Sequence, residues 1–325
     1  MTSRRDFLRA SMVAGVTLSL PRTFSSFSRL TNYSTPWAPL LYQKAGETLV
    51  TVLHTNDTHS QIDPILDNDK SYPGKGGVAR RATLVKRLRK ENPNTLMIDA
   101  GDVLQGTPYF NFYKGEVEYK AMTMIGYDAG TLGNHEFDNG VESLSKALQF
   151  ANFDIVSTNY DVRGSLLESK VKTHVVKQVG DIRVGLFGMG VSPTGLITPD
   201  NFKPVKYLDP VRMARGVVKL LREQERCNLV LGMSHLGYFP KAEENEIGDT
   251  QVVEQVDGID FIASGHTHTF MKAPVVHKSP SGNNTVIFQV GKSGIYVGRV
   301  DFTMKDGKMT AYAGGLLDLR HDALA

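Results

Sequence analysis

Five short segments of the chain carry residue types that bind metal ions. They are Asp57-Thr58-His59, Gly101-Asp102, Gly133-Asn134-His135-Glu136, Ser234-His235 and Gly265-His266-Thr267-His268. The chain has a single cysteine, Cys227, which excludes a thiolate-rich zinc or iron–sulfur site. A metal ion here is therefore held by nitrogen and oxygen ligands, a set that suits Zn, Mn, Fe or Co without choosing among them. A lone histidine of this kind is more often structural, so only the five segments together point to a metal site.

Each segment follows or ends a stretch that is typical of a buried strand. These stretches are 48–54, 94–100, 128–133, 228–235 and 259–265. In open α/β sheets, ligands bind beyond the carboxyl ends of the strands. We therefore expect the five segments to converge at one edge of a sheet.

The rest of the chain alternates between helical and strand patterns. Helices are predicted at 78–91, 116–126, 141–151, 211–225 and 249–256, and further strands at 153–158 and 182–189. The segments 284–291 and 296–312 are predicted to be antiparallel strands, the second with an Asp-Gly turn at 306–307. Alternation followed by hairpins predicts an α/β fold with a mixed sheet or two sheets.

Longer motifs around the five segments identify a family resemblance. The motifs are LHTNDTH (53–59), GGVAR (76–80), GDVLQGTP (101–108), GNHEFDNG (133–140), SHLG (234–237) and GHTHT (265–269). The chain resembles the calcineurin-like metallophosphoesterase superfamily and, within it, the 5′-nucleotidase family, from about residue 46 to residue 320. The resemblance implies an α/β metallophosphatase sandwich of mixed β-sheets flanked by helices. It places the metallophosphoesterase domain at 47–325.

The resemblance also implies two divalent metal ions. One ion would be held by Asp57, His59, Asp102 and His268, and the other by Asp102, Asn134, His235 and His266, with Asp102 as the bridge. A carboxylate suits that role because its two oxygens can span ions about 3.5–4 Å apart. Only two ligands are anionic, so positive charge remains for a phosphate ester and an attacking hydroxide. The implied reaction is attack of a metal-activated hydroxide on phosphorus.

Two further residues are catalytic by the same resemblance. His135 would support the phosphate and the leaving oxygen, and Asp138 would orient His135. Their spacing of three lets the side chains meet if the segment forms a helical turn. The alternative for Asp138 is an N-cap of the helix at 141. Glu136 receives no role, and Arg80 and Arg81 are expected at the solvated surface of their helix.

The N-terminus has the pattern of a targeting signal. Ser3 to Arg9 read SRRDFLR, followed by a mildly apolar stretch at 10–20, which resembles a twin-arginine signal. We expect a signal segment at 1–29, a linker at 30–46, and export to the periplasm or cell surface. The alternative is a disordered basic N-terminus that has no targeting function. Since a bilayer requires about 20 apolar residues, no stable membrane span is predicted.

The charge does not indicate a nucleic-acid partner. Residues 1–29 hold five of the 37 basic residues and one of the 34 acidic residues, so the remainder has 32 bases and 33 acids. The net charge of +3 thus comes from the targeting segment.

Several alternatives for substrate and partner remain open. The leading hypothesis is a phosphomonoesterase for nucleoside 5′-monophosphates or other small phosphate esters. The runner-up is a 2′,3′-cyclic nucleotide phosphodiesterase or a nucleotide-sugar pyrophosphohydrolase. Members of the 5′-nucleotidase family continue with a second domain that binds the base. In one alternative, a separate C-terminal-type nucleotidase chain supplies that domain. In another, the substrate is small enough to be bound by local loops at 61–75, 105–115 and 190–205. A non-catalytic metal-stabilised docking module is the third class.

Overall fold

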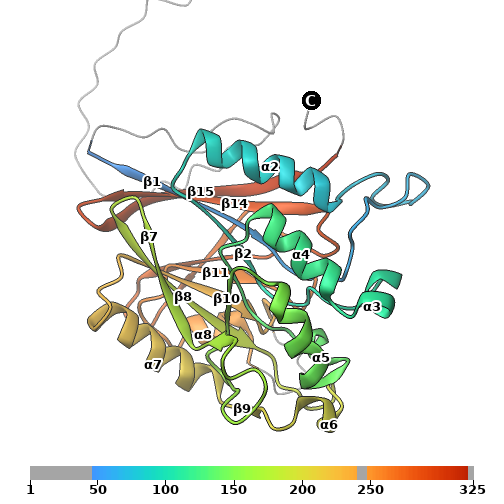
Figure 1. Ribbon diagram of the computed structural model, residues 1–325. Coiled ribbons are helices and arrows are strands. Elements are labelled where there is room, and N and C mark those ends of the chain that lie inside the picture. The colour runs from blue at the N-terminus through green and yellow to red at the C-terminus, as the bar shows by residue number, and fades with distance from the viewer. Residues whose placement is uncertain (1–45, 240–246, 321–325) are drawn as a thin grey trace, which may run out of the picture.

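The computed structural model describes residues 46–239 and 247–320. The predicted signal at 1–29 and all but the last residue of the predicted linker lie outside these ranges. Within them, two stacked β-sheets form the centre of the molecule and helices cover both outer faces (Figure 1).

The first sheet has seven strands in the order β15-β14-β1-β2-β3-β4-β6. Their bounds are β1 Thr48–Thr55, β2 Thr95–Asp99, β3 Ala129–Gly130, β4 Asp154–Val156, β6 Val171–Lys172, β14 Tyr296–Lys305 and β15 Lys308–Asp318. Strands β1, β2, β3, β4 and β6 run parallel, and β14 runs antiparallel to β1. The predicted Asp-Gly hairpin is confirmed, because Asp306 and Gly307 both have positive φ between β14 and β15.

The second sheet has six strands in the order β12-β13-β11-β10-β8-β7. Their bounds are β7 His174–Val179, β8 Ile182–Gly190, β10 Leu229–His235, β11 Phe261–Ser264, β12 Val275–Lys278 and β13 Asn284–Phe288. The prediction that 284–291 and 296–312 form antiparallel strands holds for the first segment on one side only. β13 pairs antiparallel with β12 but in parallel with β11, and β14 lies in the other sheet. The short edge strand β12 reverses the chain direction before β13, so β13 enters the centre of its sheet in parallel.

Three apolar layers hold the sandwich together. The two sheets face each other through residues such as Val50, Ile98, Leu186 and Leu231. On the outer face of the first sheet lie α2 Val78–Glu91, α4 Glu116–Ile125 and α5 Gly140–Ala147 (Figure 1). On the outer face of the second sheet lie α7 Pro210–Glu223 and α8 Asp249–Val253. The arrangement is therefore helix, sheet, sheet, helix.

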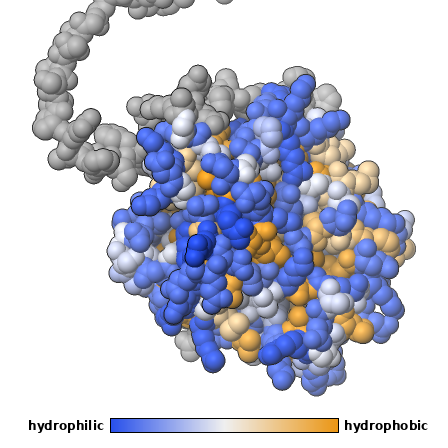
Figure 2. All heavy atoms as spheres, turned by 60° about the vertical axis from the view of Figure 1, so that its left-hand side comes forward, coloured by the Kyte–Doolittle hydropathy of each residue, from blue (hydrophilic) through white to orange (hydrophobic). Residues whose placement is uncertain are grey.

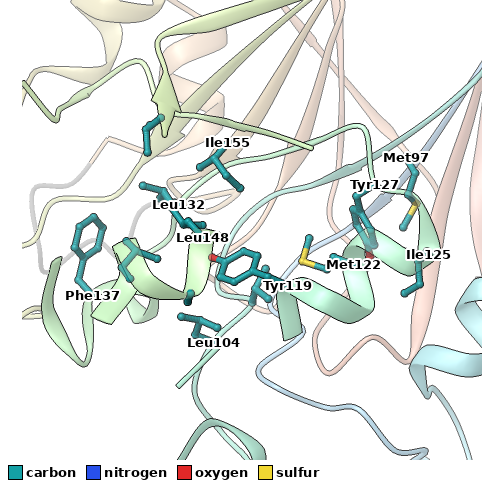
Figure 3. Close-up of a cluster of buried hydrophobic side chains, with 14 of the residues drawn as sticks. Met97, Leu104, Tyr119, Met122, Ile125, Tyr127, Leu132, Phe137, Leu148 and Ile155 are labelled. Carbon is teal, nitrogen blue, oxygen red and sulfur yellow. The ribbon is translucent and has the colours of Figure 1, made fainter. Parts of the chain in front are cut away.

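Helix α2 shows why the helices hold to the sheet. Its apolar residues Leu84, Val85 and Leu88 recur on one face and are at most 2% exposed. Burying such side chains contributes about 1.5–3 kcal/mol each. The neighbouring layer is visible in Figure 3, where Tyr119 and Met122 of α4 point into the same core.

Several short elements are not predicted by the sequence patterns. They are α3 Pro108–Tyr113, α6 Pro199–Phe202, the strand pair β5 Tyr160–Asp161 and β9 Lys206–Tyr207, and 3₁₀ turns at His135–Phe137 and Leu148–Phe150. The last of these turns ends the helix predicted at 141–151, so that α5 stops at Ala147. Elements of two to six residues are too short to show a period of their own.

The surface is mixed in character. Figure 2 shows a face on which hydrophilic residues dominate and hydrophobic residues show through in separate patches. In the described part of the chain, no helix combines the length and apolar character needed to cross a membrane.

Candidate metal centre

The five predicted segments converge at the carboxyl ends of the central strands. Asp57 and Asp102 follow β1 and β2, which are neighbours in the first sheet. His235 ends β10, and His266 follows the neighbouring β11 in the second sheet. The site therefore lies where the two sheets meet.

A first cluster contains Asp57, His59 and His268. Each offers one ligand atom, and these atoms lie within 4.8 Å of one another. The two imidazole Nε2 atoms are 3.0 Å apart, and Nε2 of His268 is 3.2 Å from Oδ1 of Asp57. Such spacing places the three ligand atoms around a volume that suits a single cation.

A second cluster contains Asp102, His235 and His266, whose ligand atoms also lie within 4.8 Å of one another. Nε2 of His235 is 2.9 Å from Oδ2 of Asp102 and 4.0 Å from Oδ1 of Asp57. The last distance joins the two clusters. Together they form one centre with room for two neighbouring cations.

Asn134 lies beside the second cluster. Its side chain is buried, and its Oδ1 has no hydrogen-bond partner among the described residues. A buried amide oxygen without a partner is costly unless a cation or water satisfies it. The next residue donates its backbone N–H to Oδ1 of Asp102 at 2.9 Å, which holds the two segments together.

Backbone carbonyls fix how two imidazoles face the centre. Nδ1 of His235 lies 2.7 Å from the carbonyl oxygen of Ala100, and Nδ1 of His59 lies 3.3 Å from that of Leu104. A carbonyl can only accept, so Nδ1 donates in each case and Nε2 is left as the ligand atom. Both rings are thereby oriented for metal binding.

The electrostatics of the centre favour a cation. Burial alone would lower the pKa of His235, but the carboxylates of Asp102 and Asp57 raise it well above its usual value. Burial likewise would raise the pKa of Asp102, yet His235 holds it well below its usual range. A field that retains a proton on a buried imidazole also attracts a metal ion, so the residues present fit the dinuclear centre implied by the sequence.

Backbone strain gathers at the same place. Five predicted ligands have positive φ, namely Asp57, His59, Asp102, His266 and His268, with values from 48° to 69°. Residues other than glycine rarely adopt this conformation, and each instance costs about 1–3 kcal/mol. Strain of this kind persists at functional sites when the surrounding structure holds it in place.

Glycine at position 133 is required by close approach. A Cβ at this position would lie 2.7 Å from Nε2 of His235 and also against Oδ1 of Asp102. Any side chain here would push the turn away from the ligands. The motif G-N-H therefore begins with the residue that lets its neighbours enter the centre.

His135 lies at the rim of the centre. Its side chain is 32% exposed, and its ring centroid is 5.4 Å from that of His59. Nδ1 of His135 lies 2.9 Å from Oδ2 of Asp138, a contact made possible by the 3₁₀ turn at His135–Phe137. This hydrogen bond raises the pKa of His135 against the opposing effect of burial. The N-cap alternative for Asp138 is wrong, because α5 begins at Gly140 with Asn139 at its N-cap.

Glu136 has a structural connection that the sequence patterns do not show. Its buried carboxylate accepts four backbone N–H groups: those of Asp102 (3.0 Å), Val103 (2.8 Å), Leu104 (3.3 Å) and Gly133 (2.6 Å). It therefore ties the loop after β2 to the turn that carries Asn134 and His135. Its position inside the motif GNHEFDNG was the one feature of the sequence that could have pointed to a role for Glu136. The four backbone contacts themselves are decided by the tertiary structure.

Arg81 corrects a second expectation. It is 2% exposed rather than solvated, and it donates to the hydroxyl of Tyr127 at 3.1 Å. That hydroxyl is 2.7 Å from Oγ1 of Thr55, which donates to Asp99 at 2.6 Å. Asp99 in turn accepts the N–H of Gly101 at 2.9 Å. Arg81 thus belongs to a buried network beneath the loop that carries Asp102.

The other histidines of the described residues, His54, His174 and His277, belong to neither cluster. His54 is fully buried and packs edge-on against Phe261 and Phe288. Nε2 of His277 is 3.0 Å from the hydroxyl of Tyr238. His174 lies in β7, and His321 is outside the described residues.

Two of the three loops predicted near the site form one groove. Residues of 61–69 and 107–113 line a cavity of about 520 Å³. The third loop lines a separate cavity of about 590 Å³ with residues of 193–203. The lining of the first groove begins with Gln61, two residues after His59, and includes Thr107, five residues after Asp102, but none of the predicted ligands.

The comparisons with known proteins agree with this site. Residues 50–270 match the family described as calcineurin-like phosphoesterase, and the chain belongs to that family. The fold and the site thus define a metal-dependent phosphoester hydrolase, and the resemblance to this superfamily is confirmed.

Several of the similar proteins are named 5′-nucleotidases. The chain is 33% identical to the 5′-nucleotidase of Rattus norvegicus over 309 residues, which cover 87% of this chain and 52% of the relative. It is 31% identical to a trifunctional nucleotide phosphoesterase of Bacillus subtilis, covering 78% of this chain and 18% of the relative. The crystal structure of a 5′-nucleotidase precursor from Thermus thermophilus superimposes with a TM-score of 0.76 at 34% identity, covering 85% of this chain and 55% of that one. The chain spans about half the length of the 5′-nucleotidases that it matches.

Proposed function

We propose that this chain is an exported phosphomonoesterase that hydrolyses nucleoside 5′-monophosphates with two divalent metal ions. The observation that carries the proposal is the pair of ligand clusters joined through Asp57, with His135 at their rim. The similarity to 5′-nucleotidases supports the choice of substrate.

The ligand assignment belongs to this proposal. One ion is held by Asp57, His59, Asp102 and His268, and the other by Asp102, Asn134, His235 and His266. The three-residue clusters and the buried oxygen of Asn134 support this division, in which Asp102 lies in the second cluster. Its share in the first ion rests on the family resemblance. When bound, the ions supply positive charge for the phosphate and activate water for attack on phosphorus.

His135 and Asp138 complete the site from its open side. Asp138 occupies Nδ1 of the imidazole, so Nε2 is the atom that can reach a substrate oxygen. We assign to His135 the support of the phosphate and the leaving oxygen, and to Asp138 the orientation of His135. A purely structural metal site would have no need of this pair, which argues against a non-catalytic docking module.

A second candidate function uses the same residues on a different ester. The Bacillus subtilis relative is named a trifunctional nucleotide phosphoesterase, which favours a cyclic-nucleotide phosphodiesterase or a nucleotide-sugar pyrophosphohydrolase as the alternative. A separate chain that supplies base recognition is a third arrangement, and adding a candidate partner to the assay tests it.

One substrate panel separates these functions. The purified chain, loaded with Mn or Zn, is assayed on nucleoside 5′-monophosphates, 2′,3′-cyclic nucleotides and nucleotide sugars, alone and with a candidate partner chain. We expect the highest kcat/KM on the 5′-monophosphates without a partner. Preference for a cyclic nucleotide or nucleotide sugar would replace the proposed substrate, and strict dependence on the second chain would make this one a catalytic subunit.

Export is tested separately. The segment with Arg4 and Arg5 lies outside the described residues, so its role rests on the sequence motif alone. Replacing both arginines by lysine is expected to keep the protein in the bacterial cytoplasm, as measured by fractionation. Unchanged export of that variant would contradict the twin-arginine route.

A further inference from the structure

The groove beside the metal centre is lined mainly by apolar and aromatic side chains. Its walls are the loop 61–69 and helix α3, which is drawn to the right of α4 in Figure 1. We propose that this groove binds the base of the nucleoside 5′-monophosphate, which is part of the nucleoside that leaves when the phosphate ester is cleaved. The inference rests on the proposed function and adds where this chain itself recognises the base.

Both walls of the groove begin at the metal centre. Ser60 directly follows His59 and donates its N–H to Val103 at 2.8 Å. Thr107, the residue before α3, donates its hydroxyl to the carbonyl of Ser60 at 2.7 Å. Gln61 and Thr107 both line the groove, so its walls continue from the segments that carry His59 and Asp102. In the proposed arrangement, the nucleoside of a phosphate ester held at the metals extends towards these walls.

Helix α3 presents more aromatic surface than folding requires. Of its four aromatic residues, Phe110 is buried in the core. Phe112 is 79% exposed and Tyr113 is 52% exposed. The rings of Tyr109 and Tyr113 stack at 6.4 Å with an interplanar angle of 28°. Exposed aromatic side chains grouped in a concave site are typical of a binding surface for a flat ring.

The groove is preformed. The hydroxyl of Tyr109 donates to Oδ2 of Asp63 at 2.9 Å and so joins the two walls. The loop is closed at its base, where Ile65 donates its N–H to Lys75 at 2.7 Å. Asp69 accepts the N–H groups of Ser71 and Tyr72 at 2.8 and 2.7 Å. Walls fixed in this way lose little conformational entropy when a ligand binds.

Size and charge select the occupant. A cavity of about 520 Å³ lies within the range of small-molecule sites, which is roughly 300–1,000 Å³. The described residues that line it include Asp63 and Asp69 but neither lysine nor arginine. Such a lining disfavours a second phosphate and favours a neutral ring, and the amide of Asn68 can donate to or accept from its polar edge.

The test compares two substrates that differ only in the base. Adenosine 5′-monophosphate and ribose 5-phosphate carry the same ester, and only the first reaches the groove. In the double variant Phe112→Ala/Tyr113→Ala we expect kcat/KM for adenosine 5′-monophosphate to fall about tenfold, mainly through KM, from the loss of two ring contacts. The value for ribose 5-phosphate is expected to change less than about twofold. Met124→Ala is the matched control, because Met124 is 86% exposed on α4 and does not line the groove.

The outcomes separate this inference from the proposed function. Equal losses on both substrates in the double variant would show that the rings only support the loop, and the inference would be overturned. Unchanged constants for both substrates would also overturn it. If size-exclusion chromatography then showed the variant losing a dimer, the groove would be a contact between two copies of the chain. A parent protein inactive on both substrates would instead refute the proposed function itself.

Discussion

Replacing Glu136 by glutamine tests how the metal centre is held in place. The two carboxylate oxygens divide their work, because Oε1 accepts from Val103 and Leu104 while Oε2 accepts from Asp102 and Gly133. Glutamine keeps one acceptor oxygen and puts an NH₂ group in the place of the other. Whichever way the amide turns, two buried backbone N–H groups then face a donor.

The contacts set the size of the effect. Leaving a buried donor without an acceptor costs about 1–3 kcal/mol, so two cost about 2–6 kcal/mol. Part of this loss is offset in the metal-free protein, because burial and the charge of Asp102 raise the pKa of Glu136 and so oppose its ionised form. Two bound dications reverse that repulsion. The metal-loaded protein should therefore lose more stability than the metal-free protein, which means weaker metal binding.

The assay measures stability and metal binding in parallel. Urea unfolding is followed with and without Mn, and Mn binding is measured by calorimetry. We expect Glu136→Gln to weaken metal binding by about 10- to 100-fold, the range found for residues that orient metal ligands. Glu118→Gln is the matched control, because Glu118 is also buried and its oxygens have no hydrogen-bond partner among the described residues. A Glu136→Gln protein that binds Mn like the parent would refute the positioning role.

Three further predictions follow from the site and the core. His135→Ala should retain both metal ions but lose about 10²–10⁴-fold in kcat, since it removes the side chain that we propose acts on the substrate; equal turnover with unchanged metal content would remove that role. Prolonged chelation should abolish hydrolysis and added Mn or Zn should restore it, whereas activity that survives dialysis against chelator would exclude the two-metal reaction. Burial lowers the pKa of His54 to about 3, so its neutral form is the one that the fold accepts. Its contribution to stability is full above pH 6.5 and is lost as the pH falls toward 3, so the unfolding free energy should drop by about 2 kcal/mol between pH 7 and 5. Urea titrations that give the same pH dependence for His54→Leu would contradict this assignment.

The sequence by itself determined most of the longer regular elements and the candidate residues of the site. Helix α2 was predicted with its observed bounds, because apolar residues on one face of a helix recur with a fixed local period. The candidate ligands could be named because each follows an apolar stretch typical of a buried strand. Strand ends in an α/β sheet face a common edge, so their neighbours along the chain were expected to meet.

Only the tertiary structure decided how those residues are held. The carboxylate of Glu136 reaches backbone groups more than thirty positions away, and no local pattern encodes such a contact. Arg81 was expected at the solvated surface of its helix, but its side chain is buried and donates a hydrogen bond to the hydroxyl of Tyr127. The positive φ of Asp57 and Asp102 likewise opposes the local preference of these residues. Local preference is worth about 1–3 kcal/mol at such positions, and the packing of two sheets against each other outweighs it.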